Sequence, residues 1–308
     1  MRIADALTGY WLDKRINLSH HTVSDYQLTF DRLLKYLGAD VPIEEISADD
    51  LRRFLADVKA KRKLGTKSMI NVWIALSSLW KWAEKELEIP HIVRRIEKPE
   101  YRRPPVEPFS RHEITALLAS SGKNAPRPGP GGVPYCSTRP TALRDRAILL
   151  ALVDTGMRSS ELCNLKVGDF DAERKQLRIR EGKGKKDRFV YVGAVTSKAI
   201  WKYLAGRKPA AKAPDALFAT RTGAHMDRYT LGNFIEACAK RAGVEHAYPH
   251  RFRHTFAITF LRNGGSPLEL QALLGHEKLD TVNIYVRLAQ VDLQEAQKRA
   301  SPADNWQL

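Results

Sequence analysis

A histidine and an arginine are spaced to bind a phosphate group on one face of a helix. His250 and Arg253 are three positions apart and follow Pro249, a residue that favours the first position of a helix. Hydrogen-bond donors at a helix N-terminus attract anions, so the pair predicts an oxyanion or phosphate site. A histidine at such a place is also typical of an ordinary packed or exposed polar residue, and the pair alone does not decide between these interpretations.

A second arginine follows a glycine turn in the sequence TGMRSSEL. Arg158 stands at the start of a predicted helix, and Glu161 is three residues further on, where its carboxylate can orient the guanidinium. An arginine in this setting is often a plain surface residue. The motif therefore predicts a held cation without saying what the cation binds.

One tyrosine stands nine residues after the sequence LLGH. Tyr285 lies between Ile284 and Val286 in a short helix that begins at Asp280 and Thr281. A tyrosine with apolar neighbours usually fills a core or an interface. The rarer alternative is a nucleophile, which requires nearby cations because the pKa of a free phenol is about 10.

These side chains must be positioned by helices and a small sheet in the second part of the chain. Residues 143–153 have an apolar helical face, and strands at 176–180 and 188–192 flank the hairpin turn EGKGKKD. Four or five helices follow, with glycines, Ser266 and Pro267 at their ends. Residues 121–140 contain PRPGPGGVP and predict a flexible loop inserted between two helices.

The first hundred residues predict a bundle of four helices and no strand. Apolar residues recur at helical spacing, Ser47 and Asp50 resemble a capping box, and Gly38 and Pro90 end helices. A basic cluster with one hydroxyl lies between the third and fourth helices. It comprises Lys59, Lys61, Arg62, Lys63, Thr66 and Lys67. This basic cluster is either a solvated helix end or an edge that contacts phosphates.

A proline-rich segment separates the two parts. The sequence KPEYRRPPVEP is too rich in proline for a helix or a strand and predicts an extended linker. We therefore expect a helical domain at residues 1–98, a linker at 99–108 and a second domain with a C-terminal tail at 109–308. Arg102 and Arg103 of the linker would face whatever the two domains enclose.

The charge of the chain indicates a polyanionic partner. Its 308 residues include 51 Lys and Arg against 35 Asp and Glu, with 17 against 15 in residues 1–100 and 34 against 20 beyond them. Cations neutralise phosphates and release counterions, which favours nucleic acid over a basic surface that only aids solubility. No apolar run is long enough to span a bilayer, no secretory signal begins the chain, and three scattered cysteines suit neither a disulfide framework nor a zinc site. We expect a soluble protein of a reducing, intracellular compartment.

The order of the motifs resembles the tyrosine recombinases, the phage integrase family that includes the Xer recombinases. The shared motifs are TGMRSSEL, GKG in a hairpin turn, HRFRHTF, LLGH and the tyrosine nine residues on, and HTVSDYQLTFDRLLKYL is similar to the second helix of the family's core-binding domain. The resemblance covers nearly the whole chain. It implies a mainly α fold with a small β-hairpin or sheet (α+β), in which a helical SAM-like core-binding domain precedes a tyrosine-recombinase catalytic domain.

The resemblance implies a role in phosphate chemistry for each motif. Arg158 and Arg253 would bind the scissile phosphate, and Tyr285 would attack it. His250 would take part in acid–base work, and His276 would donate a hydrogen bond to the phosphate. Guanidinium groups stabilise the charge that develops on the phosphate oxygens, and the same cations would ease the ionisation of the phenol.

A general acid is also required, because the leaving alkoxide is strongly basic. The match to GKG assigns this role to Lys183, with Lys185 and Lys186 as neighbouring candidates. Nothing in the sequence predicts a metal, a nucleotide site or another cofactor. The residues expected to contact DNA are the basic cluster, Arg102, Arg103, Lys185 and Lys186.

The implied activity is site-specific strand exchange through a 3′-phosphotyrosyl link, for integration or excision of a mobile element or for resolution of DNA. The expected partner is duplex DNA with an inverted-repeat core site, bound by a tetramer with two protomers active at a time, in the cytoplasm at the nucleoid. The tail after Tyr285 would dock on a neighbouring protomer or pack on its own domain. Two alternatives stay open: relaxation of DNA by a type IB topoisomerase-like enzyme, and an inactive DNA-binding regulator on the same fold.

Overall fold

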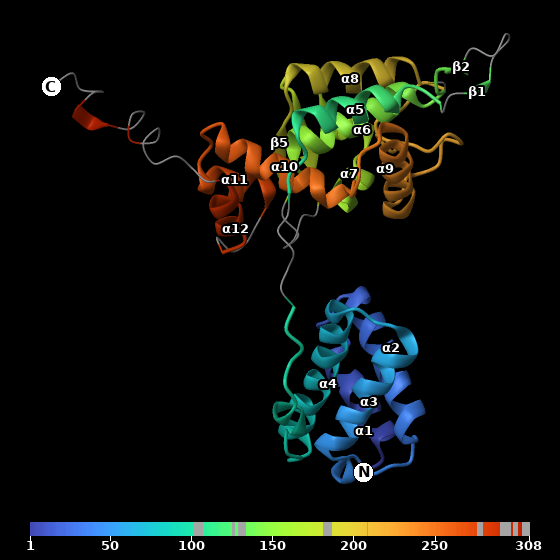
Figure 1. Ribbon diagram of the computed structural model, residues 1–308, viewed down its shortest axis with the longest axis vertical. Helices are drawn as coiled ribbons and strands as arrows, with labels where there is room; N and C mark the ends of the chain where they lie inside the picture. Colours follow the sequence, from blue (N-terminus) through green and yellow to red (C-terminus); the bar gives the residue numbers. More distant parts are fainter. Residues whose placement is uncertain are drawn as a thin grey trace. The chain divides into compact units, whose positions relative to one another are not determined.

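The chain forms two compact units, Met1–Pro104 and Pro105–Leu308 (Figure 1). The computed structural model describes residues 1–101, 107–124, 127–128, 134–180, 187–207, 209–275, 280–289, 297 and 301–303. The division between the units falls inside the predicted proline-rich linker. Within the described residues, no helix has the length and apolar character needed to cross a membrane.

The first unit is the predicted bundle of four helices. They are α1 (Ile3–Lys14), α2 (His20–Leu37), α3 (Ala48–Arg62) and α4 (Thr66–Glu86), with 3-10 turns at Ile43–Glu45 and Ile92–Arg95. Helix α4 packs against the other three. Its buried Trp80 and Leu76 lie in the core of this unit. This helix therefore holds the bundle together.

Capping residues define the helix starts in this unit. Ser47 and Asp50 form the predicted capping box at α3, with the Ser47 amide donating to the Asp50 carboxylate at 3.0 Å and the Asp50 amide donating to the Ser47 hydroxyl at 3.2 Å. Hydrogen bonds from Ser47 lower the pKa of the Asp50 carboxyl to about 2. Gly38 ends α2 with a φ of 96°, a conformation that glycine adopts without strain.

The second unit combines eight helices with small sheets among its described residues. The helices are α5 (Arg111–Ser121), α6 (Ala142–Thr155), α7 (Ser159–Asn164), α8 (Ala194–Ala205), α9 (Arg228–Ala242), α10 (Pro249–Arg262), α11 (Pro267–Leu274) and α12 (Asp280–Ala289). The main sheet is antiparallel, in the order β3 (Phe170–Asp171), β4 (Gln176–Ile179) and β5 (Arg188–Tyr191). Strands β4 and β5 are the predicted hairpin. Strand β3 was not predicted, because two residues are too few to show an alternating pattern.

The segment 121–140 differs from the prediction of a plain loop. Strand β1 (Arg127–Pro128) pairs antiparallel with β2 (Pro134–Tyr135), so that a short ladder stands between α5 and α6. Each strand contains a proline, which cannot donate to a ladder and which normally argues against a strand. The sequence pattern therefore hid this pairing.

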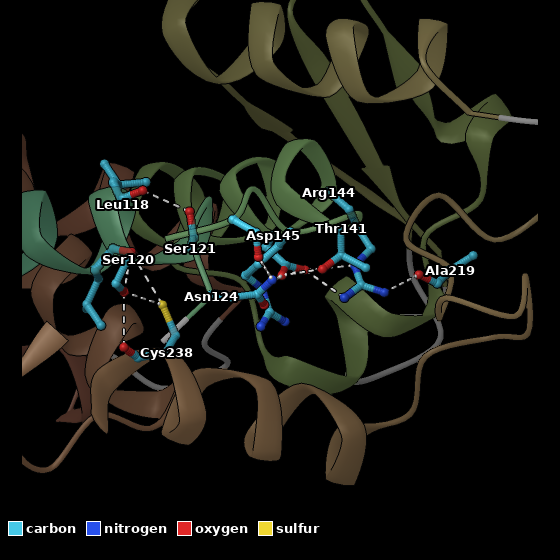
Figure 2. A network of polar contacts seen from close by, with 12 residues as sticks. Leu118, Ser120, Ser121, Asn124, Thr141, Arg144, Asp145, Ala219 and Cys238 are labelled. Atoms are coloured by element: carbon cyan, nitrogen blue, oxygen red, sulfur yellow. Dashed lines mark hydrogen bonds and ion pairs between the residues drawn. The ribbon is translucent and has the colours of Figure 1, made fainter. Parts of the chain in front are cut away.

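A buried carboxylate organises the start of α6 (Figure 2). Asp145 accepts hydrogen bonds from the Thr141 hydroxyl at 2.7 Å and from the Arg144 guanidinium at 2.6 and 2.9 Å. Arg144 also donates to the Ala219 carbonyl at 2.8 Å, which ties a distant loop to this helix. Because the carboxylate is fully buried, these bonds offset the cost of removing its charge from water.

Helix α10 joins two separate cores in the second unit. Phe252, near its start, packs in the large core formed by α5–α9 and the sheet. Ile258 and Leu261, in its second half, pack with α11 and α12 in a smaller core that contains Tyr285. The residues of the HRFRHTF motif, at the N-terminal end of α10, therefore lie where the two cores meet.

Candidate active site

Arg253 is the most deeply buried of the predicted site's described cations, at 1% exposed. It donates one hydrogen bond to the Gly156 carbonyl at 2.9 Å and another to the Leu274 carbonyl at 2.9 Å. These bonds tie the ends of α6 and α11 to α10. Burial and the nearby Arg158 lower the pKa of the guanidinium to about 10, so Arg253 carries its charge at neutral pH.

Arg158 is held by Glu161, as their spacing predicts. Its backbone N–H donates to Glu161 Oε2 at 2.8 Å, and its guanidinium donates to Oε1 at 2.9 Å. A longer contact of 3.5 Å joins the same guanidinium to the Gly275 carbonyl. The Arg158 side chain is 32% exposed and so remains accessible to a ligand.

Tyr285 lies in the small core, beside the two arginines. It is 4% exposed, and the Arg253 guanidinium lies close enough to its hydroxyl to act on the pKa of the phenol. Burial raises the pKa of the phenol above its usual value, although the charges of Arg253 and Arg158 act to lower that pKa. The cations ease ionisation as expected, but burial outweighs them, and the phenol is protonated at neutral pH.

His250 is exposed at the start of α10 and packs edge-on against a second histidine. Its ring centre is 4.4 Å from that of His254, whose ring centre is 5.5 Å from that of Tyr285. Burial, with smaller contributions from His250 and Arg253, lowers the pKa of His254 to about 4. His254 was not predicted as part of the site, although its position four residues after His250 places both on one helix face.

Arg188, on β5, is a further site residue that the sequence analysis missed. It donates to both oxygens of the Glu161 carboxylate, at 3.0 and 2.8 Å, and to the Leu273 carbonyl at 3.2 Å. Burial alone would raise the pKa of Glu161, but hydrogen bonds from Arg188 and Arg158 hold it below its usual value. Glu161 therefore stays ionised and serves two arginines at once.

Arg251, the remaining arginine of the HRFRHTF motif, has a structural environment instead. It donates to Glu113 at 2.9 Å and to the carbonyls of Glu107 and Glu245 at 3.1 and 2.8 Å. Its guanidinium also lies 4.0 Å from the ring centre of Phe109. Of the two arginines in this motif, Arg251 therefore anchors the start of the second unit, whereas Arg253 belongs to the candidate site.

Some of the predicted residues lie outside the described part of the chain. They are Arg102, Arg103, Lys183, Lys185, Lys186 and His276, together with most of the tail after Tyr285. The described strands β4 and β5 flank the segment that contains Lys183, and α11 ends shortly before His276. Their roles stay predictions.

The basic cluster of the first unit lies at the connection between α3 and α4. All six of its side chains are exposed, and Lys61 forms an ion pair with Asp57 at 2.8 Å. Lys63 ends α3 in a left-handed conformation with a φ of 48°. The cluster is therefore available to a partner in solution, and its contact with DNA stays a prediction.

The part of the chain that the structure describes contains free thiols and no cluster of metal-binding side chains. Across the described ranges, no three or more His, Cys, Asp or Glu side chains come close enough together to bind a metal ion. Cys136 is an exposed free thiol, whereas Cys163 and Cys238 are buried free thiols.

Family models match most of the chain. The model described as "Phage integrase family" matches residues 133–291, which include Arg158, Arg253 and Tyr285, and the model "Phage integrase, N-terminal SAM-like domain" matches residues 9–87. The chain belongs to the phage integrase family of tyrosine recombinases. The predicted fold class, mainly α with a small sheet, is confirmed with it.

Relatives in this family include Xer recombinases of bacteria and archaea. Tyrosine recombinase XerC of Corynebacterium efficiens is 40% identical over 160 residues, which are 52% of this chain and 51% of that protein. Tyrosine recombinase XerA of Thermococcus kodakarensis is 30% identical over 285 residues, 92% of this chain and 90% of that protein. The alignment thus spans about half the length of the Corynebacterium relative and nearly all of the Thermococcus one.

Solved structures share the fold. The crystal structure of XerA recombinase is 27% identical, with a TM-score of 0.52 and 97% of both chains covered. The Tn1549 transposon integrase in complex with circular intermediate DNA is 19% identical, with a TM-score of 0.74, 92% of this chain covered and 95% of that chain. At 19% identity, the similarity to the Tn1549 integrase shows a shared fold only.

Proposed function

We propose that this phage integrase family member is a site-specific DNA recombinase that cuts and rejoins strands through a 3′-phosphotyrosyl intermediate without a metal. The observation that carries the proposal is the closeness of the Tyr285 hydroxyl to the Arg253 guanidinium, with Arg158 close enough to influence both groups. A phenol beside two fixed guanidinium groups has the nucleophile and the charge stabilisation that attack on a phosphodiester requires.

The predicted residues account for each bond and each proton of the proposed reaction. The Tyr285 oxygen forms a bond to phosphorus while the bond to the 5′-oxygen breaks, and Lys183 supplies the proton that this leaving oxygen takes up. Because the phenol is protonated at neutral pH, its proton must leave as the new bond forms, and His250 is the candidate base. The phosphotyrosyl ester retains the bond energy, so a 5′-hydroxyl of another strand can displace Tyr285 without ATP.

The proposed partner is duplex DNA with an inverted-repeat site. Support comes from relatives solved with DNA, among them a XerH site-specific recombinase bound to a palindromic difH substrate and a lambda integrase dimer bound to a COC′ core site. We propose that four protomers assemble on paired sites with two active at a time, and that the protein acts in the cytoplasm at the nucleoid. The net charge of +16 supplies the field that attracts the phosphates.

The decisive experiment traps the covalent intermediate. Inverted repeats beside the gene, or sites selected from a random duplex library, are made into nicked duplexes that lose a short fragment after cleavage. Incubation in EDTA should yield a protein–DNA adduct in a denaturing gel and a free 5′-hydroxyl. A cut that needs magnesium, or an adduct at the 5′ end, contradicts the proposal.

A strand-exchange assay separates the proposal from its two alternatives. Two duplexes of different length, each with one site, should give recombinant lengths when both are present. Relaxation of a supercoiled plasmid without exchange supports the type IB topoisomerase-like alternative. Tight binding with neither adduct nor exchange supports an inactive regulator.

A further inference from the structure

Three arginines converge on the C-terminal end of α11. The last carbonyls of a helix have no partner within the helix and carry partial negative charge, so they attract cations. Each of three successive carbonyls accepts a hydrogen bond from a different guanidinium. The pairs are Arg188 with Leu273 at 3.2 Å, Arg253 with Leu274 at 2.9 Å and Arg158 with Gly275 at 3.5 Å.

Arg188 is held by a second contact, because it also donates hydrogen bonds to the Glu161 carboxylate, which it shares with Arg158. It contacts both oxygens of Glu161, whereas the Arg158 guanidinium contacts one. Its guanidinium packs directly on the end of α11, since a Cβ placed on Gly275 would lie 3.2 Å from three of its atoms. Arg188 and Glu161 are both largely buried, which makes the pair a fixed element of the site.

We propose that Arg188 is a positioning residue for the phosphate site, acting through Glu161 on Arg158. The inference rests on the proposed function. By binding both carboxylate oxygens, Arg188 keeps the Arg158 guanidinium from turning fully onto Glu161. The other N–H groups of Arg158 are then available to a phosphate.

The consequence of removing Arg188 follows from the charge of the cluster. Without Arg188, the Glu161 carboxylate attracts the Arg158 guanidinium into a bidentate pair with two parallel hydrogen bonds. The Arg158 N–H groups in that pair can then no longer bind the phosphate. The cluster of Arg158, Arg188, Arg253 and Glu161 also loses one positive charge. Replacing Glu161 with glutamine restores that charge, keeps the shape of the side chain and preserves its contact with the Arg158 amide, because glutamine also serves in a capping box.

The test compares R188A, the double variant R188A/E161Q and the matched control R178A. Arg178 is on the neighbouring strand β4 and pairs with Asp187 at 2.6 and 2.9 Å, so R178A removes an arginine ion pair from the same hairpin without touching Glu161. The measurement is the single-turnover rate of adduct formation on the nicked duplex at saturating protein, with DNA affinity and the unfolding midpoint measured in parallel.

We expect R188A to slow adduct formation by about 10- to 100-fold, as misplaced catalytic groups do, while DNA affinity changes less than about threefold. Adding E161Q should recover at least about tenfold of the rate, and R178A should stay within about twofold of the wild type. A residue that only stabilised the fold would lower the unfolding midpoint when removed and leave the adduct rate of the folded protein unchanged.

Three results overturn the inference. The first is an R188A rate within about threefold of the wild type. The second is a slow R188A that E161Q does not recover although both variants are folded. The third is loss of the fold in R188A and also in R188K, because Arg188 would then serve folding. Absence of an adduct with the wild-type protein is a different outcome, which overturns the proposed function and this inference together.

Discussion

The Arg253 guanidinium lies beside the Tyr285 hydroxyl, across the boundary between the two cores of the second unit. The same guanidinium is bonded to Gly156 at the end of α6, whereas Tyr285 packs with α11 and α12 in the small core. The position of the phenol relative to the phosphate site therefore depends on how α12 packs against α10. Substitutions that alter this packing should slow cleavage more than they weaken DNA binding.

Tyr285→Phe should abolish covalent attachment to DNA and leave binding near wild type. The ring stays in the small core, and only the hydroxyl that would attack phosphorus is removed. The matched control is Tyr203→Phe, which removes the hydroxyl of another buried tyrosine, one that accepts from the Ala219 amide at 3.3 Å. Adducts are counted in a denaturing gel and affinity by gel shift. An adduct formed by Tyr285→Phe would show that the nucleophile is a different residue.

Arg158→Ala and Arg253→Ala should both slow cleavage by about 100-fold or more, since each removes donors from the developing charge. Their effects on stability should differ. Arg253→Ala leaves the buried Gly156 and Leu274 carbonyls without the donors that Arg253 provides and should cost about 2–4 kcal/mol of unfolding free energy. Arg158→Ala, at a partly exposed position, should cost about 1 kcal/mol or less.

Chemical denaturation of the two arginine variants, beside their cleavage rates, checks this separation. Equal decreases in stability would mean that the hydrogen bonds from Arg253 to the two carbonyls contribute little energy. If either variant cleaved DNA at the wild-type rate, that arginine would not be part of the active site.

Gly156→Ala should destabilise the protein by about 3 kcal/mol or more and slow cleavage. Gly156 has a φ of 58°, and an added Cβ would overlap Cδ1 of Phe256 and lie 2.8 Å from its Cγ. The shift needed to relieve this clash would also move the carbonyl that holds Arg253. Gly223→Ala is the control, because Gly223 has a φ of 84° but nothing within 4 Å of the new Cβ. It should cost only about 1 kcal/mol, and equal decreases in stability would assign the whole effect to backbone strain.

Lys63→Ala and Lys67→Ala should weaken DNA binding and reduce its dependence on salt. For each phosphate that the variant no longer neutralises, the slope of log affinity against log salt should fall in magnitude by about 0.9. Lys85→Ala is the control, since Lys85 is an exposed lysine near the far end of α4 that pairs with Glu86 at 2.6 Å. Gel shifts over a salt series provide the slopes. Unchanged slopes for Lys63→Ala and Lys67→Ala would identify the basic cluster as a solvated helix end.

The elements that the sequence predicted are those whose signal is local. Helical periodicity and capping residues such as Ser47 located the bundle of the first unit, and the glycine-rich turn located the β4–β5 hairpin. The two-residue strands β1, β2 and β3 exist only through their pairing with other segments, which no local pattern records.

The same distinction applies to the site. Arg158 and Glu161 are three residues apart, so their contact was predictable from spacing. Arg188 is 27 residues from Glu161 and 85 from Leu273, and these contacts exist only in the folded chain. The net effect of burial on Tyr285 was likewise beyond the sequence, because it depends on how completely α12 and its neighbours cover the phenol.

The stability of the protein should fall as the pH drops from about 6.5 toward 4, and His254 should account for part of the decline. Its pKa is lowered from 6.5 to about 4 in the folded protein, chiefly by burial. Between these values the unfolded chain binds a proton that the folded protein does not, so protonation favours unfolding. The contribution is present above pH 6.5 and disappears toward pH 4, and a shift of this size corresponds to about 3 kcal/mol. His254→Phe keeps an aromatic ring beside His250 but cannot titrate. Urea unfolding at pH 7.5, 6.0 and 5.0 should therefore show a smaller decline in stability for this variant than for the wild type.

The matched control is His20→Phe, at an exposed position of the first unit, whose stability should decline with pH like that of the wild type. Parallel declines for wild type and His254→Phe would mean that the His254 ring becomes protonated in the folded protein as readily as in the unfolded chain.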